Sequence, residues 1–568
     1  MIERVSATPI DDDLIQLWAT TTEDKTGEVD RGWAEGPYSE QEISDILGDD
    51  LWVAARRFGI HQKDKFRQID DFSEYFVNAC TTVENKIPVS GVDAIVNTAK
   101  FWSDKILEAL ASPSRTFAFH LSDGSIHHRA LHEDFSREDT KLVGKCIALE
   151  AAYKQCAVSP AHARFSIFAL RCPSDGLVKF FFARSLPFGA VAAVHGFNRA
   201  AMALNYLVHG FVGVPCTHYF DDFTIVVPQI LGAEVDILTK KFFDILGWDI
   251  KESKDKPMAD TFTALGVEVC LGDALGDDPQ IRVENKKDRV AEICERISEH
   301  LEHDAMTPAE AAELRGKLVL SNSQTYGRFG ALAYHHLGKK AGKMASGSYL
   351  DDDLRWALQW WTRHIKKAKP RIVRTGKQKK PVYTFTDGSC EPSQTSKTGV
   401  EAGYGAVLFD PEDQTLEMFG GQVSEDLLHL LTNAGSKQQV VGQSELIPCH
   451  AAKVVWRNRL KHRRVILFID NEAARYGLIK GSSPTRDSAW LLNEFWRKEA
   501  AAESNTWIER VPSASNCADH PSRGKFSILK NLRINAMGVH LPKDYEAKLV
   551  KQWTETSGLP GPRPHFSE

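Results

Sequence analysis

Two adjacent acids, Asp221 and Asp222, stand at the centre of the most informative stretch of the chain. Apolar runs flank them, residues 212–214 before and 223–227 after, so the pattern predicts a β-hairpin whose turn carries both carboxylates. Adjacent like charges repel each other, and a divalent cation that also binds phosphate oxygens neutralises them best. For an Asp-Asp dipeptide taken alone, an ordinary hairpin turn is the better explanation. The other motifs of the chain favour a metal-binding site over an ordinary turn.

Tyr219 precedes the paired acids and completes a Tyr-x-Asp-Asp pattern, which resembles the active-site motif of reverse transcriptases. Four further segments follow the order in which that family carries its motifs. Five ordered motifs over about two hundred residues make a coincidental match very improbable. The four segments are Lys65–Ser73, Leu149–Gln155, Leu186–Ala190, and Lys254 followed by Phe262–Gly266.

The resemblance implies a role for each matching residue. In this family the hairpin carries metal-binding carboxylates, here Asp221 and, as a weaker ligand, Asp222. Lys254 would protonate the pyrophosphate leaving group, although Lys251 and Lys256 are close neighbours. The remaining nucleotide contacts would be Lys65 and Arg67 on the triphosphate, Tyr153 beside the ribose 2′ position, and Phe188 and Gly189 against the nascent base pair.

One position departs from the family pattern. In the family, an Asp lies five residues before the aromatic residue that gates the ribose 2′ position, which is Tyr153 here. This chain has Ala148 at that position, and a methyl group cannot hold a metal ion. We expect this to remove nearly all polymerase activity, because nothing else aligns the primer hydroxyl with the triphosphate. Glu150 lies two residues on and faces the same side if the strand continues, but its spacing and reach differ. Natural decay and deliberate inactivation both explain the Ala.

The C-terminal third carries four acidic segments that resemble the carboxylate positions of ribonuclease H. Residues 511–516 running into 519–523 are closest to the hepadnaviral and DIRS-type retroelement versions of that domain. The resemblance implies that four carboxylates converge on two Mg²⁺ ions, with Mn²⁺ as an alternative, and that the polymerase site also takes two ions. The His that many members place before the fourth acid is absent. The four acids are Asp387, Glu445, Asp470 and Asp519.

The bulk composition is that of an ordinary soluble globular protein, with 42% hydrophobic and 26% charged residues. Its apolar runs are far shorter than the ~20 residues of a membrane span, and no charged-then-apolar leader opens the chain. The 10 cysteines form no Cys-x-x-Cys pair, which argues against zinc fingers and a disulfide framework. We therefore expect an intracellular protein with free thiols, in the cytoplasm or nucleus and away from membranes.

The net charge of −6 counts mildly against nucleic-acid binding, but the distribution of charge is uneven. Residues 363–380 hold many Lys and Arg and no acid, which favours a track along a nucleic-acid backbone over a solvated linker. A second basic cluster lies in the ribonuclease H-like region, where a solvated helix face is the alternative. Its members are Lys453, Arg457, Arg459, Lys461, Arg463 and Arg464.

The two resemblances imply an α+β right-hand polymerase with fingers, palm and thumb, followed by a mixed α/β ribonuclease H-like domain. Apolar residues at three- and four-residue spacing predict the thumb helices, and a basic stretch predicts the connection. The predicted divisions are a lead-in at 1–45 that packs on the palm, fingers and palm at 46–275, the thumb at 276–345, the connection at 346–381, ribonuclease H at 382–526 and a tail at 527–568 that is partly helical and then loose at its Gly- and Pro-rich end.

The expected function is RNA- and DNA-directed DNA synthesis with degradation of the RNA strand of the hybrid, in a retroelement polymerase whose polymerase site is disabled. The expected partners are an RNA template, a primer strand, the RNA–DNA hybrid and deoxynucleoside triphosphates, with other retroelement proteins or a second subunit as further candidates. Two alternatives stay open: a domesticated, non-catalytic RNA-binding scaffold, and a nuclease specific for RNA–DNA hybrids.

Overall fold

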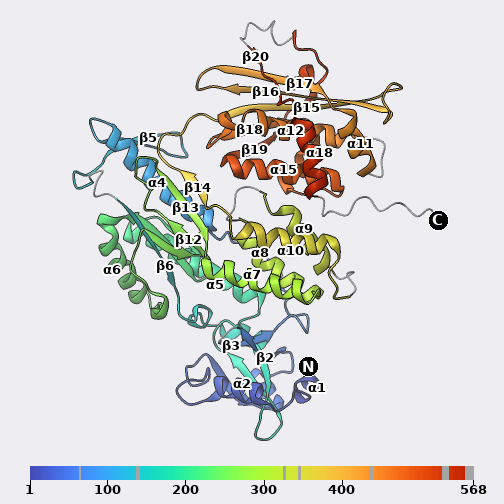
Figure 1. The fold of residues 1–568 in the computed structure, drawn as a ribbon. Helices are drawn as coiled ribbons and strands as arrows, with labels where there is room; N and C mark the ends of the chain where they lie inside the picture. Colours follow the sequence, from blue (N-terminus) through green and yellow to red (C-terminus); the bar gives the residue numbers. More distant parts are fainter. Residues whose placement is uncertain are drawn as a thin grey trace, which may run out of the picture. The chain divides into compact units, whose positions relative to one another are not determined.

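The structure is a computed structural model that describes residues 1–62, 65–135, 141–323, 328–342, 347–434, 440–527 and 536–556. It divides into two compact mixed α/β units, drawn in Figure 1, each of which is described by itself. The first unit comprises Met1–Leu265 with Val269–Ile281, and the second comprises Gly266–Glu268 with Arg282–Glu568. Among the described residues, no helix has the length and apolar character that crossing a bilayer requires.

A five-stranded sheet with the strand order β1-β8-β7-β2-β3 forms one part of the first unit. Both of its faces are buried, because consecutive phenylalanines on β8 point into two separate cores. Helices α1 and α3 contribute to one core and α2 to the other, so the N-terminal segment packs here and not on the sheet that carries Asp221. The elements are α1 (Ile2–Ser6), α2 (Asp12–Thr22), β1 (Ala34–Tyr38), α3 (Glu40–Leu47), β2 (Ala54–Gln62), β3 (Lys65–Asp71), β7 (Ile167–Arg171) and β8 (Val178–Ala183).

A three-stranded sheet with the order β6-β10-β9 forms the other part of the first unit and carries the paired acids. Phe197 on α5 and Phe243 on α6 are fully buried against one face of this sheet. Helix α4 also contacts β6 and β10. The elements are α4 (Val92–Ala111), the hairpin β4 (Thr116–His120) and β5 (Ile126–Ala130), β6 (Leu142–Ala148), α5 (Val191–Leu207), β9 (Cys216–Tyr219), β10 (Asp222–Pro228), α6 (Gln229–Ile245) and β11 (Thr261–Ala264).

Two strands, β12 (Val267–Cys270) and β13 (Gln280–Asn285), contribute residues to both units. Beyond them the second unit begins with helices α7 (Lys287–Glu302), α8 (Pro308–Ser323), α9 (Ala331–Ala341) and α10 (Asp352–Ile365), followed by the short strand β14 (Arg371–Arg374). Thr307 and Glu310 cap the start of α8 reciprocally, as the sequence predicts. Leu354, Leu358 and Trp361 place α10 in the same core as the other three helices. This helical core therefore extends beyond residue 345, the predicted end of the thumb.

The remaining residues of the second unit form a six-stranded mixed sheet with the order β19-β18-β15-β16-β17-β20. Helices α12, α15 and α18 lie on one side of it in Figure 1. The opposite face is covered around Val407 and Met418 by the segment that contains Ala518. The strands are β15 (Val382–Pro392), β16 (Val400–Asp410), β17 (Thr415–Gln422), β18 (Arg464–Ile469), β19 (Asn505–Arg510) and β20 (Ala536–Gly538). The helices are α11 (Glu425–Ala434), α12 (Val441–Val455), α13 (Arg457–Leu460), α14 (Glu472–Lys480), α15 (Arg486–Ala502), α16 (Asp519–Ser522) and α18 (Tyr545–Thr556).

The described part of the C-terminal segment, residues 536–556, packs on this domain. Strand β20 pairs in parallel with β17, and Tyr545 and Leu549 of α18 are buried in the main core. Trp553 of the same helix packs edge-on against Trp490 of α15, with ring centroids 4.9 Å apart. The domain predicted to end at residue 526 therefore includes β20 and α18.

Candidate active sites

Strands β15 and β18 bring two acids of the second unit to the same level. They run parallel with Phe385 opposite Phe468, so Asp387 and Asp470 each lie two residues beyond that pair. Asp387 is 5% exposed, and Asp470 directly follows the end of β18. The carboxylates of Asp387 and Asp470 lie side by side because β15 and β18 are adjacent in the sheet.

The third acid, Glu445, reaches the same place from helix α12. The backbone of α12 lies so close to β15 that a Cβ on Gly388 would meet the carbonyl carbon of Ser444 at 2.3 Å. A side chain at 388 would therefore push the helix away. The Gly388 amide donates a hydrogen bond of 3.2 Å to Glu445 Oε2, and ligand oxygens of Asp387, Glu445 and Asp470 all lie within 4.8 Å of one another.

The electrostatics of this cluster favour a bound cation. Burial, followed by repulsion from Asp387 and Asp470, raises the pKa of Glu445 to about 9. Burial also raises the pKa of Asp387 to about 6, against a lowering by its hydrogen bond from Ser522. Asp470 Oδ1 is buried and accepts no hydrogen bond within the described part of the chain. Two buried acids and a partly buried third with an unused oxygen fit the hard-oxygen coordination that Mg²⁺ and Mn²⁺ prefer.

The fourth predicted acid, Asp519, lies outside this cluster. It begins helix α16, its side chain is 39% exposed, and Arg523 Nε donates to its Oδ1 at 2.8 Å. Arg523 also pairs with Glu391 at 3.0 Å. The structure thus brings three of the four predicted carboxylates together and neutralises the fourth with a guanidinium.

A row of glycines seats helix α16 on the sheet. Added Cβ atoms on Gly403, Gly405 and Gly420 would meet main-chain atoms of Ser522 or Pro521 at 2.2–2.3 Å. Real Cβ atoms do not approach backbone so closely, so these three positions let α16 lie directly against β16 and β17. Ser522 and Asn516 thereby come within hydrogen-bonding distance of Asp387.

Two residues near the acids have structural roles. Asn471 accepts a hydrogen bond from the Ala474 amide and caps α14, while Ser389 donates to the Ser522 carbonyl at 3.1 Å. Asn516 and Ser522 belong to the motif in the sequence, but spacing alone did not indicate that they bind a carboxylate.

In the first unit, the paired acids occupy a tight hairpin between β9 and β10. Tyr219 pairs with Asp222, so Phe220 and Asp221 form the turn, with Phe220 at a φ of +53°. Burial and repulsion from Asp221 raise the pKa of Asp222, and Lys254 opposes that shift. Lys254 lies on the one-turn helix Glu252–Lys254, whereas its neighbour Lys251 is engaged elsewhere.

Ala148 lies directly opposite Asp222 on the neighbouring strand β6 and is 3% exposed. A carboxylate here would join the two hairpin acids. Glu150 does not replace it, because both of its oxygens accept hydrogen bonds from Lys251 Nζ at 2.8 and 3.0 Å. Among the described residues, three or more acid, His or Cys ligand atoms lie close enough to hold one ion at the Asp387 cluster and not at this hairpin.

Tyr153 stands beside the hairpin as the predicted gate. Its ring stacks on Phe197 at 4.7 Å and meets Phe188 edge-on at 5.8 Å. Burial and the charge of Asp221 raise the pKa of its hydroxyl to about 12. The charge of Asp221 therefore acts on the Tyr153 hydroxyl.

The loop containing Phe188 and Gly189 is fixed to strand β3. The Asp70 amide donates to the Phe188 carbonyl, and a Cβ on Gly189 would lie 2.1 Å from the Asp70 carbonyl oxygen. Gly189 adopts a φ of +119°, which L side chains avoid. The same strand carries Lys65 and the exposed Arg67, so the predicted triphosphate contacts and the base-pair loop share one support.

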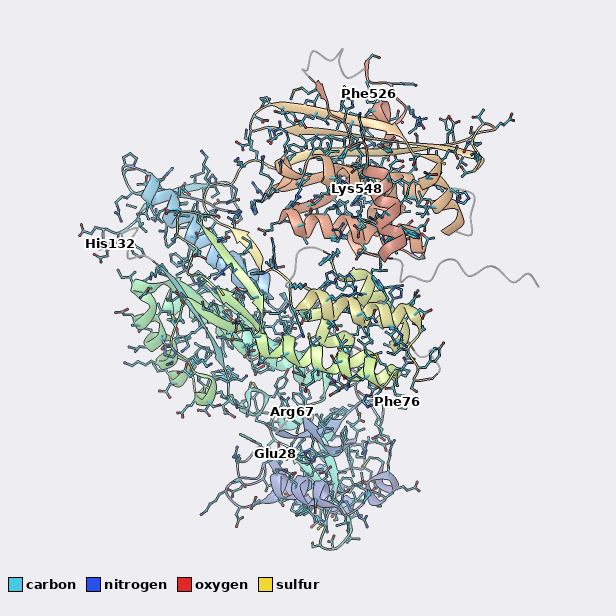
Figure 2. All side chains as sticks on the ribbon, viewed as in Figure 1. Glu28, Arg67, Phe76, His132, Phe526 and Lys548 are labelled. Atoms are coloured by element: carbon cyan, nitrogen blue, oxygen red, sulfur yellow. The ribbon has the colours of Figure 1, made fainter. Side chains whose placement is uncertain are left out.

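A buried ion cluster braces that support. Arg57 on β2 is fully buried and donates to both oxygens of Asp70, at 2.7 and 3.0 Å, and to Glu28 at 2.7 Å. Lys154, next to the gate residue, also pairs with Glu28, which is labelled in Figure 2. These four residues were not recognised from the sequence, because the charges that pair lie far apart along the chain.

The second basic cluster is largely neutralised within its own domain. Lys453 is 4% exposed and pairs with Glu499, while Arg459 pairs with Asp413 and Glu417. Arg463 forms two hydrogen bonds with Asp410 at 2.9 Å. This cluster holds the domain together, and a nucleic-acid track through these three residues is not supported.

Comparisons with known proteins place few constraints on the chain. No protein-family model and no curated protein sequence matches it. Solved structures of the foamy viral protease-reverse transcriptase do align. The dRH form in complex with double-stranded DNA has a TM-score of 0.43 and 11% identity over 88% of this chain and 70% of that one. The complex with double-stranded DNA gives 0.39 and 12% over 84% and 82%, and the complex with an RNA/DNA hybrid gives 0.35 and 11% over 86% and 76%. Function is therefore argued from the residues of this chain.

Proposed function

We propose that the chain is a reverse transcriptase–ribonuclease H whose C-terminal domain cleaves the RNA strand of RNA–DNA hybrids and whose polymerase site lacks one ligand. The observation that carries the proposal is the cluster of Asp387, Glu445 and Asp470, with ligand atoms within 4.8 Å of one another on a mixed sheet. The four acidic segments of the sequence and the Tyr-x-Asp-Asp hairpin support the same assignment.

The nuclease chemistry follows from the charges of this cluster. Two Mg²⁺ ions bound there would supply an activated water and neutralise the charge on the leaving oxygen. Asp387 and Asp470 hold their oxygens at one level of the sheet, and Glu445 adds its oxygens from the helix side. Arg523 lies at the half-exposed edge of the site, where it pairs with Asp519 and Glu391.

The polymerase half would bind template, primer and deoxynucleoside triphosphate around the Asp221 hairpin. Arg67 would hold the triphosphate, and Tyr153 would exclude a ribose 2′-hydroxyl. With Ala148 opposite Asp222, the hairpin keeps two of the three acids that the resemblance implies, so we infer that synthesis is silenced while binding persists.

A nuclease limited to RNA–DNA hybrids is the second candidate, and the buried methyl group of Ala148 is the observation that favours it. A non-catalytic scaffold fits less well. Its nuclease acids would be free to change, whereas the three clustered acids are all present together with the glycine that admits Glu445.

The deciding experiment follows end-labelled RNA in an RNA–DNA hybrid with Mg²⁺, alongside single-stranded RNA and duplex DNA. The parent chain should cleave the RNA of the hybrid and neither of the other two substrates. Asp470→Asn should abolish this cleavage. Glu401→Gln is the matched control, since Glu401 is an exposed acid on β16 of the same sheet. Hybrid cleavage that survives Asp470→Asn would refute the assignment of this site.

A further inference from the structure

Ser522 is 1% exposed, and its hydroxyl points at the first acid of the nuclease cluster. Its Oγ lies 2.6 Å from Asp387 Oδ2 and 2.9 Å from the carbonyl oxygen of Asp519. A hydroxyl has one hydrogen to donate, and a carboxylate is the stronger of these two acceptors. The hydrogen therefore goes to Asp387.

The other oxygen of Asp387 is held from the same segment of chain. Asn516 Nδ2 lies 3.3 Å from Asp387 Oδ1 and 3.1 Å from the Thr386 carbonyl oxygen. An amide nitrogen carries two hydrogens, so it can serve both acceptors. With one donor on each oxygen, the rotation of the Asp387 carboxyl group is fixed, and each oxygen keeps a lone pair for a metal ion.

The position of Ser522 is built into the sheet. Its backbone rests on Gly403 and Gly405, where any larger residue would lift it away, and Ser389 donates a hydrogen bond to its carbonyl. Two close main-chain contacts and one hydrogen bond thus hold the backbone that carries the hydroxyl. A surface serine that met Asp387 by chance would have none of these supports.

We propose that Ser522 is a positioning residue of the nuclease site, which orients Asp387 for metal binding. The inference rests on the proposed ribonuclease H function. It gives helix α16 a role separate from that of Asp519, which the helix also carries and which is paired with Arg523. Outer-shell partners of this kind typically change metal affinity 10- to 100-fold when removed.

The test measures Mn²⁺ binding calorimetrically in the full chain without nucleic acid. It is done with Asp221→Asn and Asp222→Asn so that the hairpin acids do not contribute. Ser522→Ala and the nearly isosteric Ser522→Cys should weaken Mn²⁺ binding 10- to 100-fold, whereas Ser522→Thr, which keeps a hydroxyl, should restore binding close to the parent. Ser527→Ala is the control, because Ser527 is exposed and lies five residues along.

The same variants are then assayed for hybrid cleavage across Mg²⁺ concentrations and for hybrid binding in EDTA. Half-maximal activity should shift to higher Mg²⁺ with Ser522→Ala, while hybrid affinity stays constant. Equal Mn²⁺ affinity in Ser522→Ala and the parent would overturn the proposal, as would a folded Ser522→Thr that binds as weakly as the Ala form. If no variant cleaves the hybrid but Mn²⁺ binding still depends on the hydroxyl, the nuclease function fails and the positioning role stands.

Discussion

Replacing Glu445 by Gln should stabilise the C-terminal domain without divalent metal and remove the stabilisation that metal gives. Glu445 has a folded-state pKa of about 9 against 4.5 for the ordinary group, because burial and two neighbouring acids disfavour its charge. The folded state therefore holds a proton that the unfolded state has lost. Stability is fully present below about pH 4 and declines as the pH rises toward the folded pKa.

The size of the effect follows from that interval. Between about pH 5 and pH 8 the parent should lose up to 1.36 kcal/mol per pH unit from Glu445, about 4 kcal/mol in all. Asp387, with a folded pKa of about 6, adds to the slope only at the acid end of this range. Gln carries no titrating proton, so the Glu445→Gln chain should keep only the smaller contribution of Asp387. Solvent relaxation reduces these values, so they are upper limits.

Hydrogen exchange detected by mass spectrometry on the full chain resolves the domain, with rates corrected for intrinsic pH dependence. In EDTA, peptides from β15 and α12 of the parent should lose protection from exchange as the pH rises. The same peptides of Glu445→Gln should lose less protection. Saturating Mg²⁺ should protect only the parent. Glu401→Gln, an exposed acid changed in the same way, should follow the parent. If Glu445→Gln and the parent lost protection equally with rising pH in EDTA, the view that the clustered acids Asp387, Glu445 and Asp470 repel one another would be refuted.

Three further changes test other parts of the structure. Ala148→Asp should turn undetectable primer extension on an RNA template into measurable synthesis with hybrid cleavage unchanged, since it places a third acid opposite Asp222; no extension by this variant would leave the nuclease-only candidate. Gly405→Ala should destabilise the C-terminal domain by about 1–3 kcal/mol and lower cleavage at least tenfold, because its Cβ would lie 2.3 Å from the Ser522 nitrogen; Gly442→Ala has open space and is the control in the same unfolding and cleavage assays. Arg57→Met should destabilise the first unit by about 3–5 kcal/mol in urea, because it leaves Glu28 and Asp70 buried without their partner. Arg56→Met removes a half-buried pair with Glu74 and should cost less than about 1 kcal/mol, so equal effects of the two changes would contradict the role of burial.

Local sequence predicted the elements that carry the acids, and tertiary packing decided what the acids contact. The apolar run at 223–227 was enough to predict β10 and the turn before it, because strand and turn preferences are local, whereas the other strand is Cys216–Tyr219 and not the apolar run at 212–214. The convergence of Asp387, Glu445 and Asp470 was predicted by resemblance alone, since it depends on the pairing of β15 with β18 and on Gly388. The pairing of Asp519 with Arg523 was not foreseen.

The domain ends were the least predictable feature. Strand β20 is three residues long, and such a segment has no periodicity to detect. Helix α18 shows an amphipathic pattern, but only its packing against Trp490 shows that it belongs to the sheet domain. The Arg57 cluster was missed for a related reason, because the register between β2 and β3 that pairs Arg57 with Asp70 depends on where the intervening turn falls.

The pairing of β20 with β17 and the packing of α18 on the C-terminal domain have a consequence for synthesis on the ribosome. Domains form as their chain emerges, N-terminal part first, at about 5–20 residues per second. The three clustered acids precede β20 and α18 in the chain, so they emerge before β20 can pair with β17 and before the Tyr545 hydroxyl can meet the His450 ring nitrogen at 2.9 Å. Until then β17 is an open sheet edge, the kind that recruits other strands. Until β20 pairs with β17, a nascent chain therefore carries its clustered acids in an intermediate with an unpaired sheet edge.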